Sequence, residues 1–129
     1  MSEGYIDRNV QRVYHILQRA SEIRNRIKEL SYEAFIEDST LVDATLYKLT
    51  VIGEAIRAMD DSFREAHPDL PWRSIVGLRN ILVHQYEDVD YSIVWDVITK
   101  ELPAWALHLE EVYKNFVFPD DFDPPPVPR

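Results

Sequence analysis

The chain has 129 residues, of which 46% are hydrophobic and 29% charged, a composition typical of one soluble globular domain that buries its own core. Its formal net charge of −9 argues against tight binding to duplex DNA, because nucleic-acid-binding domains usually present a net basic surface. The absence of cysteine excludes disulfides, Cys-ligated zinc and thiol catalysis. No apolar run approaches the roughly 20 residues of a membrane span and the first residues are polar, so we expect a cytoplasmic protein without a membrane partner.

Two long amphipathic helices are predicted in the first half of the chain. Apolar residues recur every three or four positions from about Asp7 to Leu30, which indicates the first helix. The segment 31–35 then predicts a short turn or helical turn in which Ser31 is the N-cap. The second long helix is expected to begin at Ser39 or Thr40 and to end near residue 59 or 60.

The second long helix is apolar over most of its circumference, because it carries two apolar stripes. A helix of this kind is buried from more than one direction. Either it forms a helix–helix dimer interface, where Gly53 would permit close approach, or it is the central helix of a bundle.

In the second half, a short helix over 62–67 is followed by a proline-containing loop and by a third main helix from about Trp72 to His84. A last helix is expected to begin at Asp88 or Asp90, and Pro103 should kink or divide it. No strand pattern, repeat or phosphate-binding loop is visible. The prediction is an all-α, up-down bundle of four to five helices over residues 1–117, followed by an acidic, proline-rich tail over 118–129 that is extended or disordered.

The segment 79–86 combines side chains suited to phosphodiester chemistry. Arg79 is a permanent planar cation, and His84 can accept or donate a proton near neutral pH. On a helix, Asn80 and His84 share one face, whereas Arg79 lies at the edge of the non-core arc. Arg79 and His84 therefore do not converge on one straight helix, and either a distortion near His84 or a second copy of the chain is needed.

Spacing alone leaves a simpler interpretation open, namely a capped or solvated helix end. Metal binding has less support, because the four histidines include no pair at ligand spacing; they are His15, His67, His84 and His108. No glycine-rich nucleotide-binding motif and no nucleophile elbow is present. We therefore expect no metal and no cofactor.

The segment from Arg79 to Tyr86 matches the Arg-x4-His-x-Tyr pattern of the HEPN superfamily, and the chain most resembles the HepT toxin family of prokaryotes. The resemblance covers roughly residues 5–115. It includes further landmarks in the family's order, at 31–35, 51–55, 67–72, 77–80 and 94–96.

This resemblance implies a metal-independent endoribonuclease that is the toxin of a type VII-like toxin–antitoxin pair and acts as a helical homodimer with both motifs lining one cleft. By the same resemblance, His84 would be the general base or acid, Arg79 would stabilise charge on the phosphate, and Asn80 would position the phosphate or His84. The RNA products would be a 2′,3′-cyclic phosphate and a 5′-hydroxyl.

The resemblance also implies a partner, a minimal (MNT-type) nucleotidyltransferase antitoxin that transfers AMP to Tyr86. The added phosphate would compete for Arg79 and obstruct the cleft. Two alternatives remain. One is a non-catalytic helical subunit that binds the nucleotidyltransferase, which the net charge of −9 favours. The weaker one is a helical protein that binds a small molecule or nucleotide.

Overall fold

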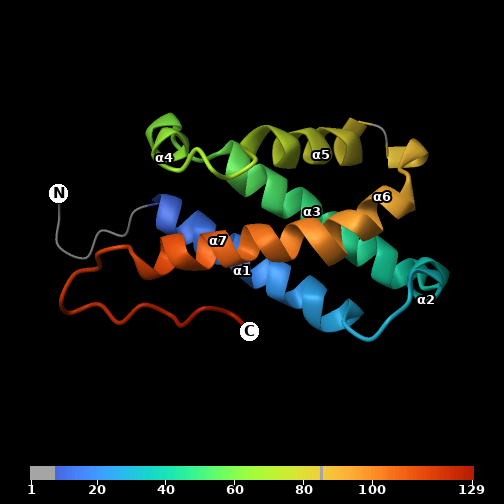
Figure 1. Ribbon diagram of the computed structural model, residues 1–129, viewed down its shortest axis with the longest axis horizontal. Coiled ribbons are helices and arrows are strands. Elements are labelled where there is room, and N and C mark those ends of the chain that lie inside the picture. Colours follow the sequence, from blue (N-terminus) through green and yellow to red (C-terminus); the bar gives the residue numbers. More distant parts are fainter. Residues whose placement is uncertain (1–7, 85) are drawn as a thin grey trace.

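A computed structural model describes residues 8–84 and 86–129, except for the side chain of Tyr86 (Figure 1). Helices account for all of the regular structure in these residues, which confirms the all-α prediction. The elements are α1 (Arg8–Ile27), α2 (Tyr32–Glu37), α3 (Ser39–Arg57), α4 (Asp61–Ala66), α5 (Trp72–His84), the 3₁₀ turn η1 (Tyr86–Asp88), α6 (Tyr91–Asp96), the π-helical segment η2 (Val97–Glu101) and α7 (Leu102–Lys114).

Helix α3 lies at the centre of the bundle. Helix α1 packs against one side of it and α5 against another, while α7 packs on α1 (Figure 1). The short helices α2 and α4 lie at opposite ends of the molecule. The two apolar stripes of α3 are therefore explained mainly by contacts within one chain, which favours the central-helix interpretation.

Side-chain caps fix three of the helix starts. Ser31 accepts a hydrogen bond from the backbone N–H of Ala34 at 3.1 Å, as predicted for the N-cap of α2. In the same way Asp38 caps α3 and Asp90 caps α6. Because α6 begins only after Asp90, the Asp90 cap sets where the connection that follows α5 ends.

Pro103 distorts the last helix but does not divide it. The backbone N–H of Leu102 bonds to the carbonyl of Val97, five residues earlier, so the chain passes from α6 through the wide turn η2 into α7. Proline lacks an N–H, and its ring crowds the carbonyl of the preceding turn. A π-helical turn accommodates this crowding while the helix continues.

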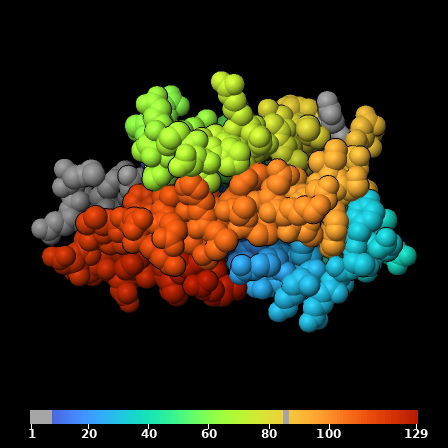
Figure 2. All heavy atoms as spheres, viewed as in Figure 1, coloured from blue at the N-terminus to red at the C-terminus, as the bar shows by residue number. Residues whose placement is uncertain are grey.

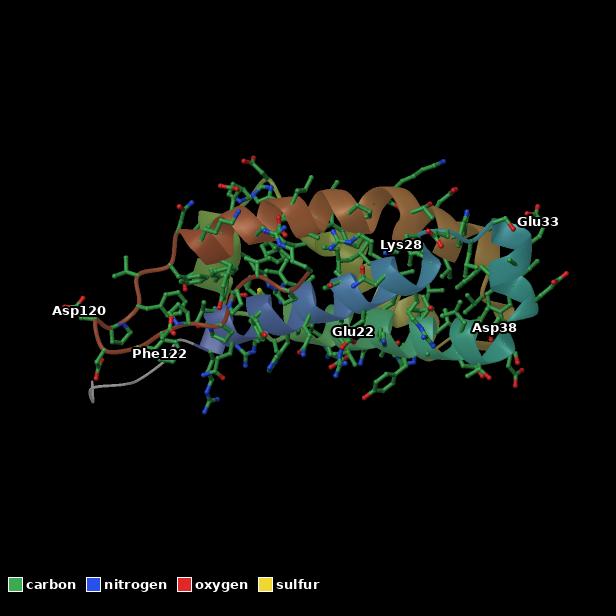
Figure 3. The ribbon with its side chains drawn as sticks, turned by 90° about the horizontal axis from the view of Figure 1, so that it is seen from below. Glu22, Lys28, Glu33, Asp38, Asp120 and Phe122 are labelled. Atoms are coloured by element: carbon green, nitrogen blue, oxygen red, sulfur yellow. The ribbon has the colours of Figure 1, made fainter. Side chains whose placement is uncertain are left out.

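The segment after α7 turns back and lies against α1 and α7 (Figures 1 and 2). The Tyr113 hydroxyl donates to the Pro125 carbonyl at 2.6 Å, and Arg129 lies 3.4 Å from the Glu110 carboxylate. Figure 3 shows Asp120 and Phe122 at the turn of this segment. Residues 118–129 are thus extended and attached to the bundle at several points. None of the described helices is long and apolar enough to cross a bilayer.

Candidate functional site

Helix α5 is peripheral and leaves much of its surface open. It packs mainly on α3, and within it only Ile75 and Leu82 are fully buried. Asn80 and His84 are both exposed on its outward side. Ile81, although apolar, is 44% exposed.

Arg79 points in a different direction from Asn80 and His84. Its side chain is only 14% exposed, and its Nε forms an ion pair with the Glu54 carboxylate on α3. Its Nη1 donates to Oδ1 of Asn80 at 3.0 Å. The guanidinium is therefore held at two points, one on each of two helices.

Gly53 makes this arrangement possible. A Cβ atom added at Gly53 would overlap Cβ of Arg79 and would lie 2.7 Å from its Cγ. The sequence interpretation in which Gly53 permits close approach at a dimer interface is thus wrong about which helix approaches. The close approach occurs within one chain, between α3 and α5.

Among the described residues, no contact joins Arg79 to His84. Helix α5 remains regular to His84, and five residues separate the two side chains by about 140° around the helix and about 7.5 Å along it. Within one chain, therefore, no distortion of α5 brings the two side chains together. Gln85 and the side chain of Tyr86 lie outside the described residues, and the backbone of Tyr86 begins η1.

Some large apolar side chains are exposed on α3 and α5. Ile81 and Val83 on α5 and Tyr47 on α3 are all exposed, Tyr47 to 65%. Each of them is ordinary alone, since much of any protein surface is apolar.

The other histidines lie outside α5, although the carbonyl of His67 accepts a hydrogen bond at 2.9 Å from Nε1 of Trp72, the first residue of α5. His15 is exposed on α1, whereas His67 ends α4 and lines a cavity of about 320 Å³ with His108 of α7. His108 is half-buried there. In the part of the chain that the structure describes, no cluster of three or more His, Asp or Glu side chains is arranged to hold a metal ion.

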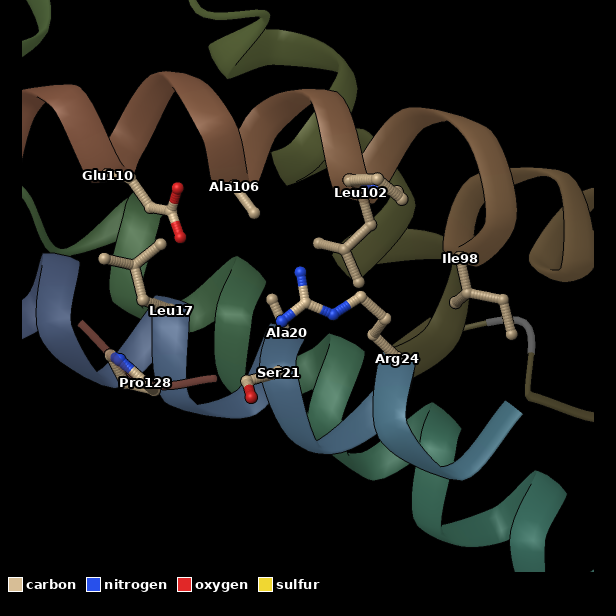
Figure 4. Close-up of a pocket in the computed structure, with 10 residues that line it drawn as sticks. Leu17, Ala20, Ser21, Arg24, Ile98, Leu102, Ala106, Glu110 and Pro128 are labelled. Atoms are coloured by element: carbon tan, nitrogen blue, oxygen red, sulfur yellow. The ribbon is translucent and has the colours of Figure 1, made fainter. Parts of the chain in front are cut away.

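A second cavity, between α1 and α7, is too small to bind an organic ligand (Figure 4). Arg24 and Glu110 point into it, and Pro128 of the tail closes one side. Its volume of about 20 Å³ is room for little more than one water molecule.

Sequence reasoning missed Glu54 as a member of the site. It lies 25 positions before Arg79, so no local spacing connects the two residues. Only the packing of α3 against α5 brings the carboxylate to the guanidinium.

The fold and the site define a small all-α bundle in which a peripheral helix carries an exposed histidine and, on another side, an immobilised arginine. The sequence model of the family described as "Ribonuclease HepT-like" matches residues 16–112. The chain therefore belongs to the Ribonuclease HepT-like family, which confirms the resemblance stated from the sequence.

Individual proteins similar to this chain carry designations consistent with this family. A protein of Caldanaerobacter subterraneus subsp. tengcongensis, provisionally designated an RNase, is 39% identical over 101 residues, covering 78% of this chain and 90% of the relative. A Methanocaldococcus jannaschii protein with the same designation is 37% identical over 78% of this chain and 92% of its own. A Thermococcus cleftensis protein, provisionally designated ribonuclease HepT, is 30% identical over 67% of this chain and 79% of its own. Among solved structures, none matches the chain significantly.

Proposed function

We propose that this protein is a metal-independent endoribonuclease whose site contains Arg79, Asn80 and His84. The observation that carries the proposal is the presence on α5 of both an exposed histidine and a guanidinium held by Glu54 and Asn80. A fixed guanidinium suits the planar oxygens of a phosphate, and an exposed imidazole is accessible to substrate. Family membership and the provisional RNase designations of the relatives support RNA as the substrate.

In the proposed reaction the ribose 2′-hydroxyl attacks the adjacent phosphorus, and the bond from phosphorus to the 5′-oxygen breaks. His84 accepts the 2′-hydroxyl proton or donates one to the leaving oxygen. Arg79 stabilises the additional negative charge on the phosphate in the transition state. Asn80 accepts a hydrogen bond from Arg79 and thereby positions the group that binds the phosphate. The products are a 2′,3′-cyclic phosphate and a 5′-hydroxyl.

We propose further that the functional unit is a homodimer in which α5 of each copy lines one cleft. Two observations support this. Arg79 and His84 of one chain point in directions about 140° apart, and the apolar side chains of Ile81 and Val83 are exposed on the same helix. A second copy would cover the apolar area and bring one chain's arginine to the other chain's histidine.

Regulation by a partner completes the proposal. A minimal nucleotidyltransferase antitoxin would transfer AMP from ATP to the Tyr86 hydroxyl, forming an oxygen–phosphorus bond and releasing pyrophosphate. Tyr86 follows α5 by two residues, so the added phosphodiester would introduce negative charge near the end of the helix that bears His84. This protein would then be the toxin of a type VII-like toxin–antitoxin pair.

Cleavage of a single-stranded RNA in excess EDTA tests the proposal. Wild-type protein should produce fragments that end in 2′,3′-cyclic phosphate, while Arg79→Ala and His84→Ala should lose this activity and keep wild-type helicity. His15→Ala is the matched control, because it removes an exposed histidine from α1. Cleavage that requires added metal, or that survives both α5 substitutions, would contradict the mechanism.

A second candidate function is a non-catalytic subunit that binds the nucleotidyltransferase. The net charge of −9 favours it, since an acidic surface repels RNA. This candidate predicts a stable complex with the partner and no RNA cleavage by the isolated protein at any concentration.

A further inference from the structure

We infer that Glu54 is a positioning residue for Arg79, fixing the guanidinium so that its remaining N–H groups are available to a phosphate. The inference rests on the proposed function, because it assigns a role within the same site. It starts from the contact between the Glu54 carboxylate on α3 and Nε of Arg79 on α5.

The contact is built into the packing of the two helices. Cβ and Cγ of Arg79 lie over Gly53, the residue immediately before Glu54. With only 14% of its side chain exposed, Arg79 has little freedom to adopt other rotamers. Two neighbouring residues of α3 therefore set where the guanidinium lies. Gly53 leaves room for the first carbons of Arg79, and the Glu54 carboxylate binds its Nε.

The geometry leaves the phosphate-binding edge of Arg79 available. A guanidinium carries five N–H donors in a planar fork. Glu54 engages Nε, and Asn80 accepts one hydrogen bond from Nη1. The remaining donors are on the two Nη atoms, and these atoms can bind two phosphate oxygens side by side.

The contact between Glu54 and Arg79 favours a role for Glu54 in positioning the guanidinium over a role in blocking phosphate binding. A carboxylate that competed with substrate would be expected to bind across the two Nη atoms, whereas Glu54 forms its ion pair with Nε. Arg57, one turn along α3, has its Nη1 4.0 Å from the same carboxylate. Glu54 thus has a second, weaker partner that does not involve the Nη atoms of Arg79.

The kinetic test compares Glu54→Ala with Glu54→Gln. The alanine variant leaves Arg79 without its anchor, so kcat should fall about 10- to 100-fold while KM changes by less than about threefold. The glutamine variant keeps an oxygen that can accept from Nε and should recover most of the lost kcat. Asp96→Ala, which removes an exposed ion pair with Lys100, is the control and should cleave like wild type.

A nuclear magnetic resonance measurement tests the inference without any RNA. The Nε–Hε signal of Arg79 should be resolved and protected from solvent exchange in the wild type and in Glu54→Gln, and it should broaden in Glu54→Ala. An unprotected signal in the wild type would overturn the inference. An alanine variant with wild-type kcat, or a glutamine variant as impaired as alanine, would also overturn it. If the signal behaves as expected but no protein cleaves RNA, the proposed function has failed and the positioning contact remains.

Discussion

Arg79 lies over Gly53, so that the first two carbons of the arginine side chain occupy the space that any side chain at position 53 would need. This relationship joins α3 to α5 and places the candidate phosphate-binding group. Because Arg79 is held by Glu54, one residue further along α3, two consecutive positions of α3 determine the geometry on α5.

Two glycine-to-alanine substitutions should therefore have opposite effects on stability. Gly53→Ala forces α3 and α5 apart and should lower the free energy of unfolding by about 1–3 kcal/mol. Gly77→Ala on α5 is the matched control. Apart from its chain neighbours and the backbone of its own helix, no atom would lie within 4 Å of the added Cβ. Because alanine has a higher helix propensity than glycine, the free energy of unfolding should rise by about 0.5–1 kcal/mol. Urea denaturation measures both changes, and an equal effect at the two positions would contradict the packing described.

Asp90 should make the stability depend on pH. Hydrogen bonds from the hydroxyl and then the backbone N–H of Ser92 hold the pKa of Asp90 below its ordinary value of 3.8. A lowered pKa means that the folded state favours the carboxylate, so its contribution is present above the ordinary pKa and is lost as the pH falls through the folded-state value. Asp90→Asn keeps an oxygen for the N-cap but does not titrate.

The measurement is the urea midpoint of wild type and Asp90→Asn between about pH 6 and about pH 2. The advantage of the wild type should shrink as the pH falls. Parallel curves for the two proteins would show that the cap does not depend on the charge of Asp90.

The C-terminal segment should contribute to stability through Tyr113. Its hydroxyl donates to the carbonyl of Pro125 at 2.6 Å from a buried ring. Tyr113→Phe removes this hydrogen bond and should lower the free energy of unfolding by about 1 kcal/mol. Tyr91→Phe, at an exposed position on α6, should change it by much less. If deleting residues 119–129 left the wild-type stability unchanged, the segment would not stabilise the bundle.

Tyr86 gives a prediction about regulation. After co-expression with an active minimal nucleotidyltransferase, intact-mass measurement should show AMP added to the wild type and none added to Tyr86→Phe. Tyr91→Phe is again the control and should be modified like the wild type. An unmodified wild-type protein, under conditions where the partner is active on another substrate, would remove the regulatory role proposed for Tyr86.

The fold was largely predictable because its signals are local. The periodicity of apolar residues indicated the long helices, and Ser31 was identified as an N-cap from its position before an apolar turn. The bounds of α5 were also predicted, with the proline-containing loop marking its start.

The details of the site were less predictable because they depend on packing between distant residues. Helical geometry indicated that Arg79 and His84 point apart, but it did not show that Arg79 turns toward α3. The role of Gly53 was assigned to the wrong helix pair, since a glycine in sequence indicates close approach without naming the partner. The exposure of Ile81 likewise depends on packing, because α5 packs mainly on α3.

The most direct test of the account is complementation between two inactive variants. Arg79→Ala and His84→Ala should each be inactive alone. If each site takes Arg79 from one copy and His84 from the other, a mixed dimer contains one intact site. Equal amounts that exchange freely form mixed dimers in half of the population, so cleavage in EDTA should return to about a quarter of the wild-type rate. A mixture that forms mixed dimers and stays as inactive as either variant alone would contradict a site shared between two chains.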